Sequence, residues 1–205
     1  AEILRTEGLN YFTVTDIRIC TVDSSADLDR FIRLPGMLYG SAKGFVQPLV
    51  LERRDALRRN KNPYFRHGEA QFWLALRNDR PVGRISAQID SLYTERHGRD
   101  VGHFGLIDAA DDREVVQALT DTAAAWLAAR GMKRMFGPFN LSSNEECGQL
   151  ISGFDATPML MMGYGPPYLD QHLSALGFGK AKDLVAYDYE VTPEVPPHKQ
   201  RFVAK

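Results

Sequence analysis

Apolar and polar residues alternate in several short runs along the chain, and this alternation predicts strands. The clearest pair is a hairpin: residues 71–77 are rich in aromatic side chains, Asn78 and Asp79 supply the turn, and residues 81–93 form the return strand. Further strands are predicted at residues 13–22, 101–107, 133–136 and 184–191. The sequence therefore predicts a protein with extensive β-structure.

Apolar residues at helical spacing predict four helices among these strands. The strongest pattern lies in residues 113–130, and its periodic apolar residues are Val115, Val116, Leu119, Ala123, Trp126 and Leu127. Asp111 stands three residues before Glu114, a carboxylate variant of the capping box, and Gly131 is expected to end the helix in the left-handed conformation. The other helices are predicted at residues 26–39, with a break or kink at Pro35, and at 50–59 and 168–176.

Residues 137–168 are predicted to form a long loop, because they are dense in Gly, Pro, Asn, Ser and Met. A loop of this length inside a compact domain is usually functional or disordered. Its apolar residues, among them Phe154 and the run from Met159 to Met162, argue against disorder.

The composition excludes several classes of protein. The chain carries 25 basic and 26 acidic side chains, so no global field attracts a nucleic acid or a membrane surface. No apolar run approaches the ~20 residues of a membrane-spanning helix, and the first residues show no signal peptide pattern. Cys20 and Cys147 lie far apart and are expected to be free thiols. We therefore expect a cytoplasmic globular protein.

The order of these elements and four local segments resemble a known family. The segments are FIRLPGMLYG, NPYFRHGEAQFWLA, GPFNLSSNEECGQL and GFDATPMLMMGYGPPY. They are similar to a bacterial subgroup of the GNAT superfamily of N-acetyltransferases, and the resemblance covers about residues 13–191. Members of this subgroup usually carry a second GNAT domain after a linker.

The resemblance implies a fold, a co-substrate and a division of the chain. The implied fold is α+β (mixed α/β), with a central, mostly antiparallel twisted sheet and helices on both faces. Residues 1–12 would be an N-terminal extension, 13–191 the GNAT-like domain, and 192–205 a linker or the start of a further segment. The resemblance implies acetyl-CoA or another acyl-CoA as co-substrate, a small-molecule amine as acceptor, and no metal, nucleic acid or membrane span. The expected protein partner is a second copy in a homodimer or a second GNAT-like domain.

The junction after the strand at 101–107 departs from the family pattern. The family usually has Q/R-x-x-G-x-G/A there, whose backbone amides hold the donor's diphosphate. This chain instead has the run Asp108-Ala109-Ala110-Asp111-Asp112-Arg113, which lacks the glycines and places three carboxylates beside the expected phosphates. The resemblance assigns donor contacts to the backbone of Leu106, Ile107 and Asp108 and to the side chain of Arg113. From its own context, Asp108 is better explained as a turn or capping residue.

Outside the polar part of the long loop, His103 and Tyr168 are the candidates for proton transfer. His103 lies within the strand at 101–107, where the family often carries its base, although a lone strand histidine is more often structural. Tyr168 is the candidate acid, since Leu173 stands where many members have a tyrosine. The alternative for Tyr168 is a packing role with a satisfied hydroxyl. Tyr164 is a further candidate for the substrate site.

The long loop supplies the candidates for acceptor binding. Asn140 and Asn144 are expected to bind the substrate, and Glu145 is expected to act as a base or to pair with an ammonium group. The alternative is a short helix whose capping box joins Ser143 to Glu146. Met161 and its apolar neighbours suit the lining for an acyl chain or an apolar amine, whereas an ordinary buried loop is the simpler explanation.

Three functions remain open at this point. The first is an N-acyltransferase that uses acyl-CoA. The second is a degenerate GNAT-like domain that recognises a substrate or partner without binding a donor, which the missing glycines favour. The third is a transferase with an aminoacyl-tRNA or carrier-protein donor, bound by the basic helix that runs from Arg53 to Lys61.

Overall fold

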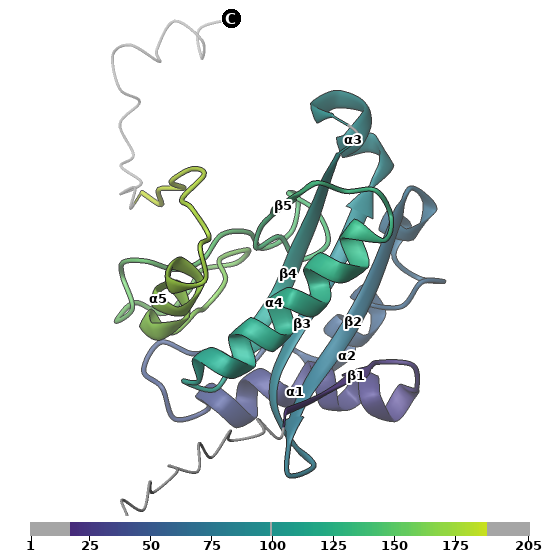
Figure 1. Ribbon diagram of the computed structural model, residues 1–205. Helices are drawn as coiled ribbons and strands as arrows, with labels where there is room; N and C mark the ends of the chain where they lie inside the picture. The colour runs from purple at the N-terminus through teal and green to yellow at the C-terminus, as the bar shows by residue number, and fades with distance from the viewer. Residues whose placement is uncertain (1–16, 99, 188–205) are drawn as a thin grey trace, which may run out of the picture.

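A computed structural model describes residues 17–98 and 100–187, which fold around one sheet. Its five strands lie in the order β1-β2-β3-β4-β5 (Figure 1). They are β1 (Ile17–Thr21), β2 (Gly68–Arg77), β3 (Arg80–Asp90), β4 (Val101–Ala109) and β5 (Arg134–Phe136). All neighbouring strands are antiparallel except β4 and β5, which are parallel. The expected mixed fold with a mostly antiparallel sheet is therefore confirmed.

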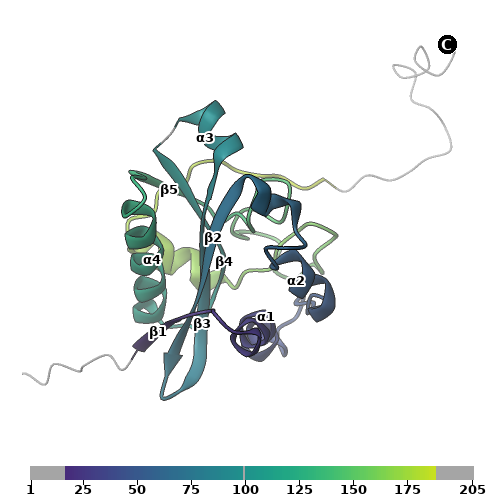
Figure 2. The same ribbon diagram turned by 90° about the vertical axis from the view of Figure 1, so that its right-hand side faces the viewer.

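Helices cover both faces of this sheet (Figure 2). α1 (Ser25–Tyr39) and α2 (Val50–Ala56) lie on one face, whereas α4 (Arg113–Ala128) and α5 (Pro167–Ala175) lie on the other. The 3₁₀ helix η1 (Pro63–Arg66) precedes β2, and α3 (Ser91–His97) follows β3 at one end of the sheet. In the two described ranges, no helix has both the length and the apolar character needed to cross a bilayer.

Alternating side chains of β2 supply two hydrophobic cores. Trp73 packs toward α4, where it joins a cluster that includes Leu119. Phe72 and Leu74 point to the opposite face and pack with Phe31 of α1. The rings of Phe31 and Phe72 meet edge to face at 5.4 Å. Full burial of a side chain of this kind contributes about 1.5–3 kcal/mol, so both layers of helices are fixed to the sheet.

Pro35 does not break α1, so of the two predicted outcomes, a break or a kink, the break is wrong. A proline cannot donate the backbone hydrogen bond to the carbonyl four residues earlier, which here is that of Phe31. Arg84 of β3 supplies the missing donor, because its Nη1 lies 2.8 Å from the Phe31 carbonyl oxygen. The helix therefore continues to Tyr39.

Asp90 caps α3, a helix that the sequence prediction missed, and Asp112 caps α4, whose predicted start at Arg113 is confirmed. β3 ends at Asp90 rather than at residue 93, because the Asp90 carboxylate accepts a hydrogen bond from Leu92 N at 2.9 Å and begins α3. The N-cap of α4 is Asp112 and not Asp111: Asp112 Oδ1 accepts from the amides of Glu114 and Val115 at 2.9 and 3.4 Å. Both side chains occupy amides that a helix start leaves free.

Other element ends also differ from the prediction. α2 stops at Ala56 rather than at residue 59, because Asn62 Nδ2 donates to the Ala56 carbonyl oxygen at 2.7 Å. Gly131 does adopt the expected left-handed conformation, with φ of 82°. Residues 184–187 form no strand, so that part of the prediction at 184–191 is wrong. Residues 13–16, 188–191, the N-terminal extension at 1–12 and the linker at 192–205 lie outside the described residues.

β4 separates from β5 after residue 103 and then contains a bulge. Gly105 lies opposite Ser86 and Asp108 opposite Arg84, so two residues of β4 share one position of β3. Leu106, in this bulge, has a positive φ of 45°. In the described residues the parallel pairing with β5 covers residues 101–103. The loop after β5 then meets the edge of β4, where Phe139 N donates to the Phe104 carbonyl oxygen at 2.8 Å. The strand edge beyond the bulge is therefore open to contacts other than a strand.

Replacing Gly105 with alanine is expected to destabilise the fold by about 3 kcal/mol or more. An added Cβ would lie 1.7 Å from the carbonyl oxygen and 2.5 Å from the carbonyl carbon of Phe139, where the loop crosses β4. Gly179→Ala is the matched control, because its Cβ would meet nothing within 4 Å. Urea unfolding of both variants measures the difference, and an equal midpoint would show that the loop does not pack on β4 in this way.

Candidate functional site

A cleft opens beside β4 where β5 leaves the sheet. Leu106, Ile107 and Asp108 of β4 line one side, and residues 138–149 of the long loop line another. Residues 45–48, which precede α2, lie across from them. The cavity volume is about 90 Å³, against the roughly 300–1,000 Å³ of most ligand pockets. In this conformation the cleft has room for a small polar group.

Glu146 is the loop carboxylate that lines the cleft. Its Oε2 accepts a hydrogen bond from Asn140 Nδ2 at 2.9 Å, and its Oε1 pairs with the guanidinium of Arg53 on α2. The main chains of Asn140 and Glu146 are also joined, because Asn140 N donates to Glu146 O at 2.9 Å. The Glu146 side chain is 22% exposed. The loop therefore presents a half-buried carboxylate with one amide donor and one cationic partner.

Asp108 and Arg84 form a buried ion pair beside this carboxylate. Arg84 Nε donates to Asp108 Oδ2 at 2.7 Å, and the guanidinium also lies 4.8 Å from the centre of the Phe31 ring. Burial raises the pKa of the Asp108 carboxyl above its ordinary value, although Arg84 opposes the shift. The expectation that Asp108 is a turn or capping residue is wrong, because Asp108 lies inside β4 and is buried.

The open edge of β4 is occupied by side chains of the chain itself. The amide of Leu106 donates to Asn140 Oδ1 at 2.8 Å, and the amide of Ala109 donates to the hydroxyl of Tyr39 at 3.1 Å. The hydroxyl of Tyr168 donates to the carbonyl oxygen of Ala109 at 2.8 Å. A donor that paired along this edge would have to replace these three hydrogen bonds.

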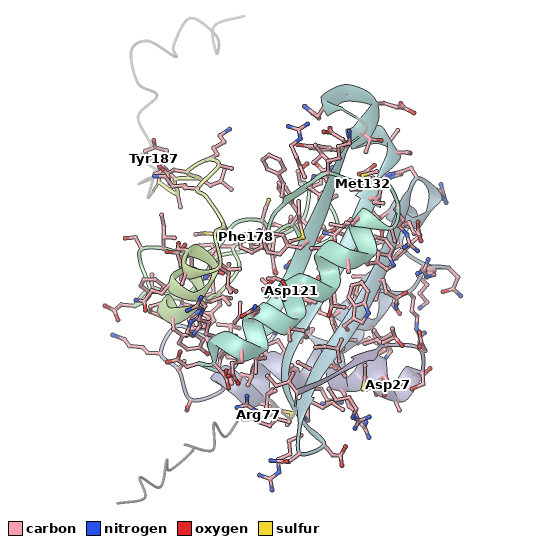
Figure 3. All side chains as sticks on the ribbon, in the orientation of Figure 1. Asp27, Arg77, Asp121, Met132, Phe178 and Tyr187 are labelled. Carbon is pink, nitrogen blue, oxygen red and sulfur yellow. The ribbon has the colours of Figure 1, made fainter. Side chains whose placement is uncertain are left out.

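The start of α4 is also satisfied internally. Asp112 caps the helix and pairs with Arg77, the side chain labelled in Figure 3, at 2.5 Å. Asp111 Oδ1 lies 2.8 Å from His172 Nε2 of α5. Arg113 donates to the Ala175 carbonyl oxygen at 3.3 Å and does not line the cleft. The carboxylates that the sequence places at this junction are therefore partnered by groups of the same chain.

Aromatic and apolar side chains surround the mouth of the cleft. The rings of Tyr39, Phe45 and Tyr164 lie within 5.4 to 5.7 Å of one another. Met162 lines the cleft, whereas Met161, which the sequence favoured, does not. The neighbouring Leu160 is 93% exposed, so this part of the loop is not the ordinary buried loop of the simpler explanation.

His103 lies in a separate small niche. It is 3% exposed, and its ring stands 4.4 Å from Tyr93 and 5.0 Å from Phe139. Burial lowers the pKa of His103 to about 4; Asp90 opposes this shift and His97 adds to it. Among the residues that the structure describes, Nε2 of this ring has no hydrogen-bond partner. The niche does not include Asn140 or Glu146, so the structure does not bring the predicted base to the cleft.

The structure gathers some of the predicted site residues and separates others. Those that line the cleft are Asn140, Tyr164, Leu106, Ile107 and Asp108. Those that do not are His103, Glu145, Asn144, Tyr168, Met161 and Arg113. Asn144 is exposed, and the alternative of a capped short helix at 143–146 is wrong because these residues form turns.

Four residues of the site were missed from the sequence: Glu146, Arg53, Arg84 and Tyr39. Glu146 is next to the predicted Glu145, and the loop has no periodic pattern that would show which of the two side chains faces the cleft. The basic stretch from Arg53 to Lys61, which begins on α2, is the sequence signal for Arg53, although it predicts a tRNA or carrier donor. Most of its charge is used internally: Arg53 pairs with Glu146, Arg54 with Asp29, and Lys61 with Asp55.

Two curated proteins are similar to this chain in sequence. The bacterial ceramide synthase of Caulobacter vibrioides is 45% identical over 194 residues, which are 94% of this chain and 50% of that protein. Protein YghO of Escherichia coli is 45% identical over 161 residues, which are 78% of this chain and 41% of that protein. The chain thus spans about half the length of the curated relatives it matches. No family model matches the chain.

Solved structures identify the fold. An aminoglycoside acetyltransferase from an uncultured soil metagenomic sample, in complex with sisomicin, matches with a TM-score of 0.50 at 11% identity. The match covers 86% of this chain and 97% of that one. At this identity the match shows the fold alone. The chain therefore has the GNAT fold, as its sequence resemblance implied.

The niche of His103 predicts a pH dependence of stability. Unfolding restores an ordinary histidine pKa near 6.5, whereas the folded value is about 4. The unfolded state therefore binds more protons between these values, and stability falls as the pH is lowered from 6.5 toward 4. Between pH 7 and pH 5 the histidine lowers the free energy of unfolding by about 2 kcal/mol, and His103→Phe is expected to remove this decrease. Urea unfolding at both pH values measures it, and equal pH slopes for the two proteins would refute the neutral, buried imidazole.

Proposed function

We propose that the chain takes part in an N-acylation, in which an acyl group passes from acyl-CoA to a primary amine held in the cleft. The observation that carries this proposal is the Asn140–Glu146 pair beside the bulge of β4, where the strand edge leaves β5. The similarity to a protein named bacterial ceramide synthase supports the same class of reaction. A ceramide is an amide of a fatty acid and a long-chain amino alcohol.

The residues of the cleft fit the proton transfers of this reaction. The amine enters as an ammonium ion, and Glu146 accepts its proton, which frees the nitrogen lone pair. The nitrogen attacks the thioester carbonyl and then loses a second proton. The carbon–sulfur bond breaks, and the thiolate leaves and takes up a proton, so the reaction of the ammonium ion releases one proton to solvent in total. The amide of Leu106 lies in the bulge and donates its hydrogen bond to Asn140 Oδ1 when no substrate is bound. During the reaction this amide would donate to the carbonyl oxyanion instead and stabilise it.

Tyr168 keeps a proton available for the departing thiolate. Burial raises the pKa of its hydroxyl to about 12, so this group is protonated at neutral pH. The hydroxyl lies at the end of the open β4 edge, on the carbonyl oxygen of Ala109, and not in the cleft with Glu146. The proposed acid and the proposed base therefore occupy separate positions along one strand edge.

The surroundings of the cleft favour an acceptor with an apolar chain. Val46, Pro158 and Met162 line it, and Met159 and Leu160 are 71% and 93% exposed. Apolar groups exposed together are a usual sign of a binding surface. Methionine side chains adapt to chains of different shape. A long-chain primary amine combines the ammonium group for Glu146 with an alkyl chain for this rim.

The second candidate is a domain that recognises the acceptor without binding the donor. It is favoured by the internal hydrogen bonds of the Leu106 and Ala109 amides and by the Asp112 cap of α4. In this case the acyl-CoA would be bound elsewhere in a longer protein, in keeping with relatives of about twice this length.

Calorimetric titration with decanoyl-CoA decides between the two candidates. The first predicts saturable binding with a Kd in the range of about 1 μM to 1 mM, as for most enzyme substrates. Free decanoate, which lacks the nucleotide and the pantetheine arm, is the control ligand. If decanoyl-CoA gives no more heat than decanoate at millimolar concentration, this chain does not hold the donor and the second candidate stands.

Glu146→Gln is expected to lower kcat for N-acylation by about 10²–10⁴, because the amide cannot accept the ammonium proton. The rate is followed by thiol release from decanoyl-CoA with octylamine as acceptor. Glu145→Gln is the matched control, since it removes a neighbouring carboxylate that does not line the cleft. Equal losses in both variants would contradict a specific role for Glu146 as the base.

A further inference from the structure

The contact between α2 and the cleft points to a second role for this carboxylate. We propose that Arg53 is a specificity-determining residue. In the acceptor-free protein its guanidinium pairs with Glu146 Oε1, and the acceptor's ammonium group replaces it there. Binding of the acceptor is then an exchange of one cation for another. This inference rests on the proposed function, and it names the ammonium subsite within it.

The two partners of Glu146 are held in different ways. Asn140 belongs to the same loop and is fixed to Glu146 by a main-chain hydrogen bond of 2.9 Å as well as by its side chain. Arg53 comes from α2, 93 residues away in sequence, and reaches Glu146 only through its long side chain. Asn140 therefore fixes Oε2, whereas Oε1 faces a partner that can be exchanged.

The shielding of the pair explains why the exchange needs a cation. The side chains of Arg53 and Glu146 are only 19% and 22% exposed. A carboxylate shielded to this degree is costly without a counter-ion, so a neutral ligand that displaced Arg53 would leave an unpaired charge. An ammonium group keeps the charge balance, whereas the alcohol of the same length does not. The pair thereby selects amines over alcohols.

α2 has few contacts that a withdrawal of the Arg53 side chain would disturb. None of its seven residues is fully buried against the described part of the chain, although Val50 packs partly buried against the core around Phe31, and its N-cap, Leu49, makes no side-chain capping hydrogen bond. Within residues 17–98 and 100–187, its one other ion pair to a distant element joins Arg54 to Asp29 of α1 at 2.6 Å. Leu57, just after the helix, is buried and anchors its C-terminal end. Release of Arg53 therefore breaks one ion pair and no core packing.

Binding of octylamine and of 1-octanol to the full chain, measured by calorimetry, tests this inference. Arg53→Met removes the competing cation and retains the apolar stem. It is expected to tighten octylamine binding about fivefold, the factor that one such ion pair is worth. Arg53→Lys restores a cation and should bind octylamine as the wild type does. Octanol, which cannot replace the cation in the wild type, should also bind Arg53→Met more tightly, because no ion pair then has to be broken, and its binding to Arg53→Lys should not change.

Arg54→Met is the matched control, because it breaks the other ion pair of the same helix on the side facing α1. If it tightens octylamine binding as much as Arg53→Met does, loosening of α2 is the cause and the exchange is refuted. If Glu146→Gln weakens octylamine binding but Arg53→Met leaves it unchanged, the exchange fails and the proposed acceptor site stands. If no protein prefers octylamine to octanol, both proposals fail.

Discussion

The buried guanidinium of Arg84 is the contact on which the rest of this architecture depends. From β3 it pairs with Asp108 of β4, donates to the Phe31 carbonyl that Pro35 leaves without a partner, and lies over the Phe31 ring. A charge removed from water is tolerated only when it is paired and hydrogen-bonded. These contacts meet that condition, so α1 keeps its proline and stays on the sheet. They also place the ion pair of Arg84 and Asp108, whose opposite charges cancel, in the lining of the cleft.

Pairing of charges within the chain also accounts for the three aspartates at the junction of β4 and α4, where the family binds a diphosphate. Three aspartates there would repel a diphosphate if they were free. In the fold Asp108 pairs with Arg84, Asp111 with His172, and Asp112 with Arg77 and the first amides of α4. The carboxylates are thus satisfied, but they use the helix N-terminus that holds phosphate in other proteins. An acyl donor that entered here would compete with the cap of the helix itself.

The parts of the structure that could be predicted from the sequence are those in which hydrophobic residues recur at regular spacing. The alternation of β2 and β3 and the apolar stripe of α4 are repeated over many residues, so a single misread position does not change the assignment. The irregular loop has no period, and nothing local indicates that Glu146 rather than Glu145 faces the cleft. Asp111 and Asp112 are likewise adjacent and identical, so the sequence prediction placed the cap of α4 one residue too early. Arg53 could not be paired from the sequence, because its partner is 93 residues away.

The two carboxylates of the cleft differ in whether their present partner can be exchanged. Asp108 is 7% exposed and its Oδ2 accepts from Arg84 Nε at 2.7 Å, so a ligand that took this place would leave Arg84 as a buried cation without a counter-ion. Breaking a buried pair in this way costs of the order of 3–5 kcal/mol. Displacement from Glu146 frees only Arg53, which comes from a helix with no buried residue among those described and can return to solvent. Glu146 can therefore change its partner without disturbing the core. This difference, and not proximity alone, is why the proposal gives the amine to Glu146 rather than to Asp108.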